Sequence, residues 1–195
     1  LPHLVDEISI SSEVLPLHRE YERTSTTVMN SYLTPLVREY FSQLELKLEQ
    51  SKLAARLQMM QSNGGLVRTE RAAKFPILTL LSGPAGGAMA AANLGQLLGE
   101  THLLTLDMGG TSCDVTGVID NNPDTRIDFE IGGYAVSCPT IDIHTVGAGG
   151  GSIARVDEVG RLSVGPASAG SDPGPACYGR GGELPTVTDA NLVLG

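Results

Sequence analysis

The stretch His102-Leu-Leu-Thr-Leu-Asp107-Met-Gly109-Gly110-Thr111-Ser112-Cys113-Asp114-Val-Thr-Gly-Val-Ile119 decides the fold of this chain. Two apolar runs flank a glycine pair, and this pattern predicts two strands joined by a turn. Glycines let the main chain approach a ligand, and the N–H groups of such a turn form a concave anion site. An acidic residue beside an anion site is useful when a cation lies between them, so Asp107 is predicted to hold magnesium. A plain hairpin with an acidic turn is the alternative.

The composition limits the class of protein. A chain of 195 residues that is 41% hydrophobic can form one or two domains with a core. Its net charge of −9 argues against nucleic acid or an anionic membrane surface as the main partner, but it permits nucleotide binding. Three scattered cysteines without a C-x-x-C pair favour reduced thiols in a cytoplasmic protein. The chain lacks an initiator Met and ends inside an apolar run, so we expect a piece of a longer protein.

Residues 1–100 are predicted to form a helical segment with some strand that leads into the core. Apolar residues recur every three or four positions from Thr26 to about Gln50 and predict a helix with this stripe in the core: Met29, Leu33, Leu36, Tyr40, Leu44 and Leu48. Pro35 either kinks this helix or begins its second part, with Thr34 as the N-cap. Before the helix, Ile8 and Ile10 fit a short edge strand.

Further short elements follow the long helix. Residues 57–61 suit a strand, 62–65 a turn and 69–74 a short helix. The glycine-rich segment 81–87 predicts a turn that opens a helix over 88–98, which Gly99 ends. Such a turn either holds an anion at the helix N-terminus or allows close contact between helix and sheet. Both interpretations stay open.

Residues 101–195 are predicted to carry the hairpin and a second glycine loop. Strands at 102–107, 112–119 and 126–131 suggest an antiparallel meander, followed by a strand at 140–146 and a hairpin over 153–164. Residues 165–185 form a long loop, and long ordered loops are often functional.

The second glycine loop comprises Gly147, Ala148, Gly149, Gly150, Gly151 and Ser152. It differs from the dinucleotide-binding pattern G-x-G-x-x-G at Ser152, and the residues after it suggest a strand instead of the required helix. A loop lying against a nucleotide is therefore the better interpretation.

Four other polar residues have open roles. Asp142 and His144 alternate along the predicted strand and either bind metal, act as acid and base, or form a hydrogen-bonded pair that braces the loop. The brace is favoured, because two ligands do not make a metal site. Cys177 lacks a readable base and favours a structural role. Arg180 suits either a phosphate contact or a surface charge.

Seven segments together resemble the hydantoinase A/oxoprolinase family, whose members include N-methylhydantoinase A, 5-oxoprolinase and the acetone carboxylase beta subunit. The likeness covers nearly the whole chain and keeps the family's order. The segments are Glu20–Thr27, Gln61–Gly65, Leu81–Gly87, Asp107–Asp114, Asp142–Ser152, Gly165–Gly182 and Pro185–Asn191.

The resemblance implies part of an α/β nucleotide-binding fold of the actin, sugar kinase and Hsp70 type (ribonuclease H-like). It also implies a subunit of an ATP-dependent hydrolase that uses ATP and magnesium to phosphorylate the amide oxygen of a small cyclic amide. The implied partner is a hydantoinase B-like subunit or domain, and a homo-oligomer is allowed. The hairpin residues Gly109, Gly110, Thr111 and Ser112, together with the second glycine loop, would then bind the nucleotide. Asp107 and Asp114 would be the catalytic carboxylates, with Asp107 also at the metal.

Three other functions fit the same resemblance. One is a subunit of an ATP-dependent ketone carboxylase. Another is a kinase of small metabolites, and the third is a non-enzymatic nucleotide switch of the actin type.

Overall fold

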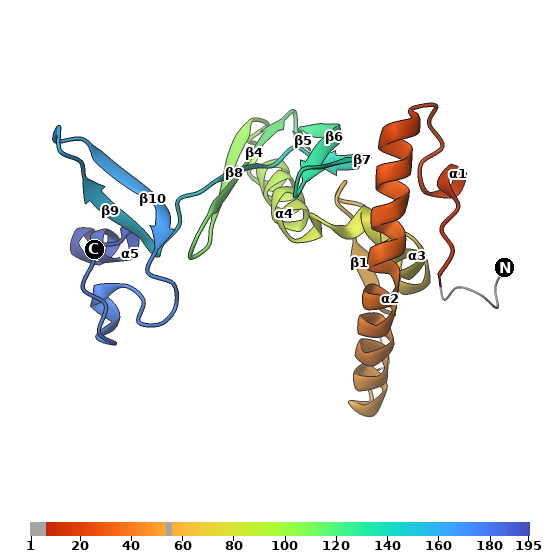
Figure 1. Ribbon diagram of the computed structural model, residues 1–195, viewed down its shortest axis with the longest axis horizontal. Helices are drawn as coiled ribbons and strands as arrows, with labels where there is room; N and C mark the ends of the chain where they lie inside the picture. Colours follow the sequence, from red (N-terminus) through yellow and green to blue (C-terminus); the bar gives the residue numbers. More distant parts are fainter. Residues whose placement is uncertain (1–6, 54–55) are drawn as a thin grey trace.

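The computed structural model describes residues 7–53 and 56–195 as a mixed α/β structure. Figure 1 shows a long helix at one side, strands packed with a second long helix in the middle, and a strand hairpin with a short helix at the other side. The helices are α1 (Ser11–Val14), α2 (Glu20–Gln50), α3 (Thr69–Lys74), α4 (Ser82–Leu98) and α5 (Val187–Leu194), with short 3-10 helices η1 (Pro76–Thr79) and η2 (Ala176–Tyr178). The strands are β1 (Gln58–Met60), β2 (Leu66–Arg68), β3 (Leu103–Met108), β4 (Cys113–Ile119), β5 (Asn122–Pro123), β6 (Thr125–Ile131), β7 (Tyr134–Ile141), β8 (His144–Val146), β9 (Ser152–Val156) and β10 (Leu162–Ser168).

All strand pairings in the described residues are antiparallel. One sheet joins β3, β4 and β5, with β8 also paired to β4, while β1–β2, β6–β7 and β9–β10 form separate pairs. The predicted β3–β4 hairpin is confirmed, and so is the hairpin made by β9 and β10.

The predicted meander is wrong at its third strand. Asp120 and Asn121 turn the chain with positive φ, and β5 follows β4 for only two residues. The chain then leaves this sheet, and β6 pairs with β7, a strand that the sequence analysis missed over most of its length. Burial decides this pairing: Phe129 and Val136 lie in a core cluster with Ile77 of η1, to which α2 contributes Met29.

Helix α2 runs without interruption from Glu20 to Gln50, through Pro35. It begins six residues before the predicted start, and Thr34 is not an N-cap. Its hydroxyl donates to the carbonyl oxygen of Asn30 at 2.7 Å, a bond within the helix. Proline costs an intrahelical bond, but the packing of the flanking turns keeps this helix whole.

The buried face of α2 is also shifted from the predicted stripe. Polar residues lie innermost, together with Phe41: Thr26, Asn30 and Thr34 are at most 3% exposed. Leu36 and Tyr40 from the predicted stripe are about 60% exposed. The buried polar groups have partners, because Asn30 donates to the carbonyl oxygen of Lys74 and Thr26 accepts from the N–H of Ser137. Position on the helix, more than hydrophobicity, therefore decides which side chains are buried.

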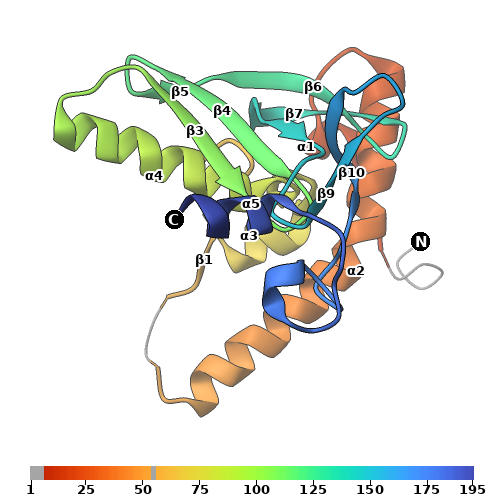
Figure 2. The same cartoon turned by 90° about the vertical axis from the view of Figure 1, so that its left-hand side faces the viewer.

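Helix α4 corrects the prediction for the glycine-rich segment. The helix begins at Ser82, so the segment 82–87 forms its first turns instead of a preceding loop. The close contact occurs further along, at Gly95, where a Cβ atom would lie 2.6 Å from the Leu103 side chain and 2.7 Å from the Glu100 carbonyl oxygen. The predicted stop is confirmed, because Gly99 ends the helix with a φ of 76°. Figure 2 shows the β3–β4 hairpin lying along α4.

The N-terminal part differs from the prediction as well. The described residues from Glu7 to Ile10 form no strand, and α1 follows them, so the predicted edge strand is wrong. Residues 1–6 lie outside the described part. The predicted short helix at 69–74 and the strand within 57–61 are confirmed as α3 and β1. Within the described residues, no helix combines the length and the apolar character needed to cross a membrane.

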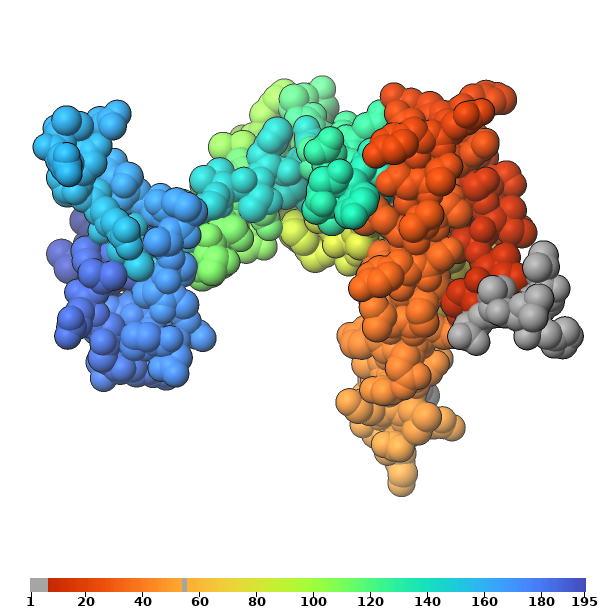
Figure 3. All heavy atoms as spheres, viewed as in Figure 1, coloured from red at the N-terminus to blue at the C-terminus, as the bar shows by residue number. Residues whose placement is uncertain are grey.

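The C-terminal residues form an arm that stands away from α2. Figure 3 shows open space between the two in this view. The arm holds β9, β10, the long loop and α5, whose start is fixed by a capping box between Thr186 and Asp189. Figure 2 shows α5 beside the turn end of the β3–β4 hairpin. This placement brings the long loop (165–185) close to the turn of the β3–β4 hairpin (109–112).

Candidate functional site

The hairpin places two carboxylates side by side. Asp107 near the end of β3 and Asp114 near the start of β4 are direct partners in the ladder, so their side chains lie on the same face. Asp107 is exposed and Asp114 is half-buried. No ion pair of the described residues includes either one. Like charges opposite one another repel, and a bound cation would relieve that repulsion.

A threonine on the neighbouring strand extends this pair into a row. Thr145 of β8 is the ladder partner of Asp114, and its hydroxyl donates to Asp114 Oδ1 at 2.7 Å. The row across β3, β4 and β8 is therefore Asp107, Asp114 and Thr145. Thr145 could not be identified from the sequence, because only the register of β8 against β4 brings it here.

The turn between the strands presents free main-chain donors. The N–H of Gly109 closes the turn by donating to the Ser112 carbonyl oxygen at 2.9 Å. The N–H groups of Gly110, Thr111 and Ser112 find no acceptor among residues 7–53 and 56–195. Successive free N–H groups of this kind attract an anion. These three N–H groups are therefore available to an anion, and the anion site stays a prediction.

The second glycine loop packs directly on this turn. The N–H of Gly150 donates to the Gly109 carbonyl oxygen at 2.9 Å, and the N–H of Gly151 to that of Gly110 at 2.7 Å. A Cβ atom on Gly149 would lie 2.6 Å from the nitrogens of Thr111 and Ser112. Glycine is therefore required at Gly149 because two main chains meet there.

Side chains below the loop hold it in place. The fully buried Ser152 hydroxyl accepts the N–H of Gly149 at 2.8 Å. On α5, the N–H and the hydroxyl of Thr188 both donate to the Gly150 carbonyl oxygen at 2.8 Å. Thr188 was not identified from the sequence. The structure thus gives Ser152 a supporting contact within the loop.

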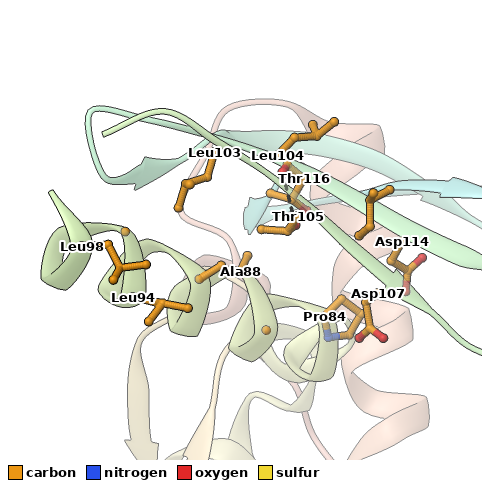
Figure 4. Close-up of a pocket in the computed structure, with 14 residues that line it drawn as sticks. Pro84, Ala88, Leu94, Leu98, Leu103, Leu104, Thr105, Asp107, Asp114 and Thr116 are labelled. Atoms are coloured by element: carbon orange, nitrogen blue, oxygen red, sulfur yellow. Dashed lines mark hydrogen bonds between the residues drawn. The ribbon is translucent and has the colours of Figure 1, made fainter. Parts of the chain in front are cut away.

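Two hollows lie beside the β3–β4 hairpin. The first has a volume of about 410 Å³ and lies between α4 and the hairpin, with leucines at one end and Asp107 and Asp114 beside Pro84 at the other (Figure 4). The second, of about 920 Å³, lies between the turn and the C-terminal arm. Its lining includes Gly109, Gly110, Thr111, Gly150 and Gly151, but not Gly147, Gly149 or Ser152.

The carboxylate row fits a magnesium ion. The described residues contain no group of three acidic, histidine or cysteine side chains that would enclose a metal. Magnesium does not need one, because it keeps several waters and is commonly held by one or two carboxylates and the phosphates of a substrate. Asp107, exposed and unpaired with any cation in the described part, is the side chain best placed to hold it, with Asp114 next to it.

Asp142 and His144 do come together, but not on one strand as predicted. The strand breaks after Ile141, and β8 begins only at His144. Asp142 Oδ2 lies 3.5 Å from His144 Nε2, and Oδ1 lies 3.2 Å from a guanidinium nitrogen of Arg126. The ladder pairs His144 with Val115, one position from Asp114, so this group faces away from the carboxylate row.

The remaining two candidates, Cys177 and Arg180, are neighbours of Tyr178 and do not themselves line the second hollow. Cys177 is exposed, and its thiol is not activated: a hydrogen bond with the Asp189 carboxylate raises the pKa of Cys177 above its ordinary value. Arg180 places its guanidinium carbon 5.9 Å from the centre of the Tyr178 ring. Tyr178 itself lines the hollow, and the sequence analysis did not single it out.

A turn with free donors, a paired carboxylate row and a supporting glycine loop define a candidate anion and cation site on an α/β scaffold. Comparison with known proteins gives the family: the sequence pattern of the Hydantoinase/oxoprolinase family matches residues 23–195, and the chain belongs to this family. Among its relatives, the caprolactamase subunit alpha of Pseudomonas jessenii is 45% identical over 94% of this chain and 26% of the relative. The 5-oxoprolinase 1 of Arabidopsis thaliana is 42% identical over 96% of this chain and 14% of the relative.

Solved structures give the same result. The ATP-dependent caprolactamase from Pseudomonas jessenii superimposes with a TM-score of 0.78 at 41% identity, covering 96% of this chain and 27% of that one. Nucleotide-free acetone carboxylase, which carries out ATP-dependent acetone carboxylation, gives a TM-score of 0.72 at 31% identity, covering 95% and 26%. The chain thus spans about a quarter, or less, of the length of these relatives.

Proposed function

We propose that this chain is the phosphate-binding part of an ATP-dependent hydrolase of cyclic amides, of the hydantoinase and 5-oxoprolinase type. The observation that carries the proposal is the turn with three free N–H groups beside Asp107 and Asp114. Donors for an anion and carboxylates for a cation within one hairpin suit the phosphates of a magnesium nucleotide. In the proposed whole protein, a second lobe of the actin-like fold completes the clamp on ATP.

The chemistry follows from the stability of the amide. Water attacks an unstrained amide slowly, because the nitrogen is a poor leaving group and the carbonyl is weakly electrophilic. In the proposed reaction the amide oxygen attacks the γ-phosphorus of ATP and ADP leaves. The phosphorylated amide carbon then adds water, and the ring C–N bond breaks with a proton going to the nitrogen, which leaves an acyl phosphate. A second water hydrolyses this acyl phosphate to a carboxylate and inorganic phosphate. The protein mainly positions the reactants and stabilises the charge of the transferred group.

Each residue of the hairpin has a place in this scheme. The N–H groups of Gly110, Thr111 and Ser112 hold phosphate oxygens. Asp107 holds magnesium, which would neutralise charge on the phosphates, or orients the attacking group. Asp114, fixed by the Thr145 hydroxyl, stays an acceptor and keeps a second negative charge next to Asp107.

A second candidate is an ATP-dependent ketone carboxylase subunit, which the likeness to acetone carboxylase favours. The same hairpin would serve it, because phosphorylating an oxygen also activates that reaction. A hydantoinase B-like subunit is the proposed partner in either case, and the cytoplasm the proposed location. The two candidates are separated by the products that the whole protein forms from 5-oxoproline, from hydantoin, or from a ketone with bicarbonate. A phosphorylated metabolite that accumulates as the final product would indicate a kinase instead.

Substitution of one carboxylate tests the proposal. In the whole protein, Asp107→Asn should keep the fold but lower substrate-dependent ATP hydrolysis at least about a hundredfold, the scale for losing one positioned group from a charged transition state. Asp124→Asn is the control, since Asp124 is exposed and lies near the end of β4 that is opposite the turn. Rates are measured at saturating Mg-ATP. Parent-like turnover by Asp107→Asn would contradict the proposed role, and turnover without any cyclic amide would indicate a nucleotide switch.

A further inference from the structure

The hollow between the turn and the C-terminal arm has the size of a nucleotide site. Its volume of about 920 Å³ lies within the usual range for ligand pockets. Four segments enclose it: the turn after β3, the second glycine loop, the end of β10 with the loop after it, and the first two turns of α5. The lining of 13 residues contains five glycines, so much of its surface is main chain: Met108, Gly109, Gly110, Thr111, Gly150, Gly151, Ser168, Gly170, Ser171, Pro175, Tyr178, Thr188 and Asn191.

None of these lining residues is charged. A ligand with its own carboxylate, such as 5-oxoproline, would find no basic side chain among these lining residues, although Arg180 lies against the Tyr178 ring, and a small cyclic amide would leave most of the volume empty. The lining instead suits a neutral group with an aromatic ring, hydroxyls and an amide-like edge. A nucleoside has these properties.

Two side chains of the lining are free to contact such a group. The Tyr178 ring is half exposed, and neither its phenol nor the side-chain amide of Asn191 forms a hydrogen bond with any residue in 7–53 or 56–195. A base can stack on an aromatic ring whatever its identity, whereas a side-chain amide matches the N6 and N7 edge of adenine with two hydrogen bonds.

The same hollow reaches the free donors of the turn. Gly110 and Thr111 belong to its lining, and their N–H groups have no acceptor among the described residues. A nucleotide lying here would place its phosphates at the turn and its base toward the arm. Asp107 and Asp114, which line the other hollow, each stand two residues from the turn in the chain, so the phosphate end would be near the carboxylate row.

We propose that this hollow holds the nucleoside of ATP, with the base stacked on Tyr178 and its adenine edge recognised by Asn191. The inference rests on the proposed function, and it adds the residues that select the base. The C-terminal arm, with its hairpin and long loop, would then be the adenine-binding side of the site.

Binding measurements on the whole protein test this assignment. Calorimetry would compare Mg-ATP, Mg-GTP and magnesium tripolyphosphate, which has the phosphates but no base. Tyr178→Ala should weaken Mg-ATP at least about tenfold while tripolyphosphate binds as before, and Tyr178→Phe should stay within about twofold of the parent. Asn191→Ala should weaken Mg-ATP about tenfold or more and Mg-GTP less, so that the preference for adenine narrows. The matched control is Tyr134→Ala, an exposed tyrosine on β7 outside this hollow.

The outcomes separate this inference from the proposed function. Unchanged Mg-ATP affinity in Tyr178→Ala would overturn the inference, as would a higher KM for the cyclic amide with Mg-ATP binding intact, which would make the hollow the substrate site. In both cases tripolyphosphate binding at the turn leaves the proposed function standing. If the parent binds neither Mg-ATP nor tripolyphosphate, the proposed function fails and the inference fails with it.

Discussion

A single methyl group at Gly149 should separate the second glycine loop from the phosphate turn. In Gly149→Ala the new Cβ would lie 2.6 Å from two main-chain nitrogens, of Thr111 and Ser112, and 2.7 Å from the Gly109 carbonyl oxygen. Ordinary contacts of a carbon atom are near 3.5 Å, so the two main chains must move apart by roughly 1 Å. Main chain surrounds the position, and no flexible side chain can give way.

The size of the effect follows from the bonds that this shift breaks. The contacts from Gly150 to Gly109 and from Gly151 to Gly110, now 2.9 and 2.7 Å, would lengthen beyond hydrogen-bonding distance. Two bonds at about 1 kcal/mol each, plus about 1–3 kcal/mol for overpacking, give a local loss of roughly 3–5 kcal/mol. A displacement of about 1 Å at a catalytic site costs on the order of a hundredfold in rate.

Two measurements on the whole protein check this prediction. Substrate-dependent ATP hydrolysis should fall about a hundredfold, and amide hydrogen exchange at 147–152 should be faster by at least about a hundredfold, as expected for 3 kcal/mol of lost local stability. Gly83→Ala is the control, because a Cβ there meets no atom within 4 Å and lies in a helix. Parent-like exchange and turnover in Gly149→Ala would refute the argument that the loop supports the turn.

Three further predictions concern the chain as a whole. The 195-residue chain alone should show no amidohydrolase activity and should bind Mg-ATP more weakly than micromolar by calorimetry, because the proposed clamp needs two lobes. Iodoacetamide at pH 8 should label the exposed Cys177 slowly and leave Cys138 unlabelled until unfolding, since burial raises the pKa of Cys138 to about 11; mass spectrometry of peptides reports both. Hydrogen bonds from Thr186 hold the pKa of Asp189 below its usual 3.8, so this carboxylate stabilises the fold above that pH and loses the effect as pH falls. Asp189→Asn should therefore unfold at a lower temperature than the parent at pH 7, with the difference shrinking below pH 4.

The elements that could be predicted from the sequence are those that local signals define. The β3–β4 hairpin has two apolar runs around a glycine pair, and α4 ends at a glycine with left-handed backbone. The start of α4 and the pairing of β6 with β7 could not be predicted, because tertiary burial decides both. In α2, apolar residues at spacings of three or four predicted the buried face. Met29 and Leu33 of that stripe do pack on the core, but packing against η1 and β7 shifts the most buried positions to Thr26, Asn30 and Thr34.

The site divides in the same way. Asp107 and the turn that follows it stand next to each other in the sequence, so their pattern was readable. Thr145 reaches the site through the register of β8, and Thr188 through the packing of α5. No sequence pattern around either residue predicts this position. Residues whose role depends on distant main-chain contacts are therefore found only in three dimensions.

The main-chain character of the contact between the two glycine segments limits how this region can change in evolution. The donors of Gly150 and Gly151 meet the acceptors of Gly109 and Gly110 in strict order. Inserting or deleting one residue between 147 and 152 would shift every donor by a position and leave the turn unsupported. In this protein and its homologues, this segment should keep a constant length, and insertions should collect instead at the exposed tip near 157–161 that joins β9 to β10.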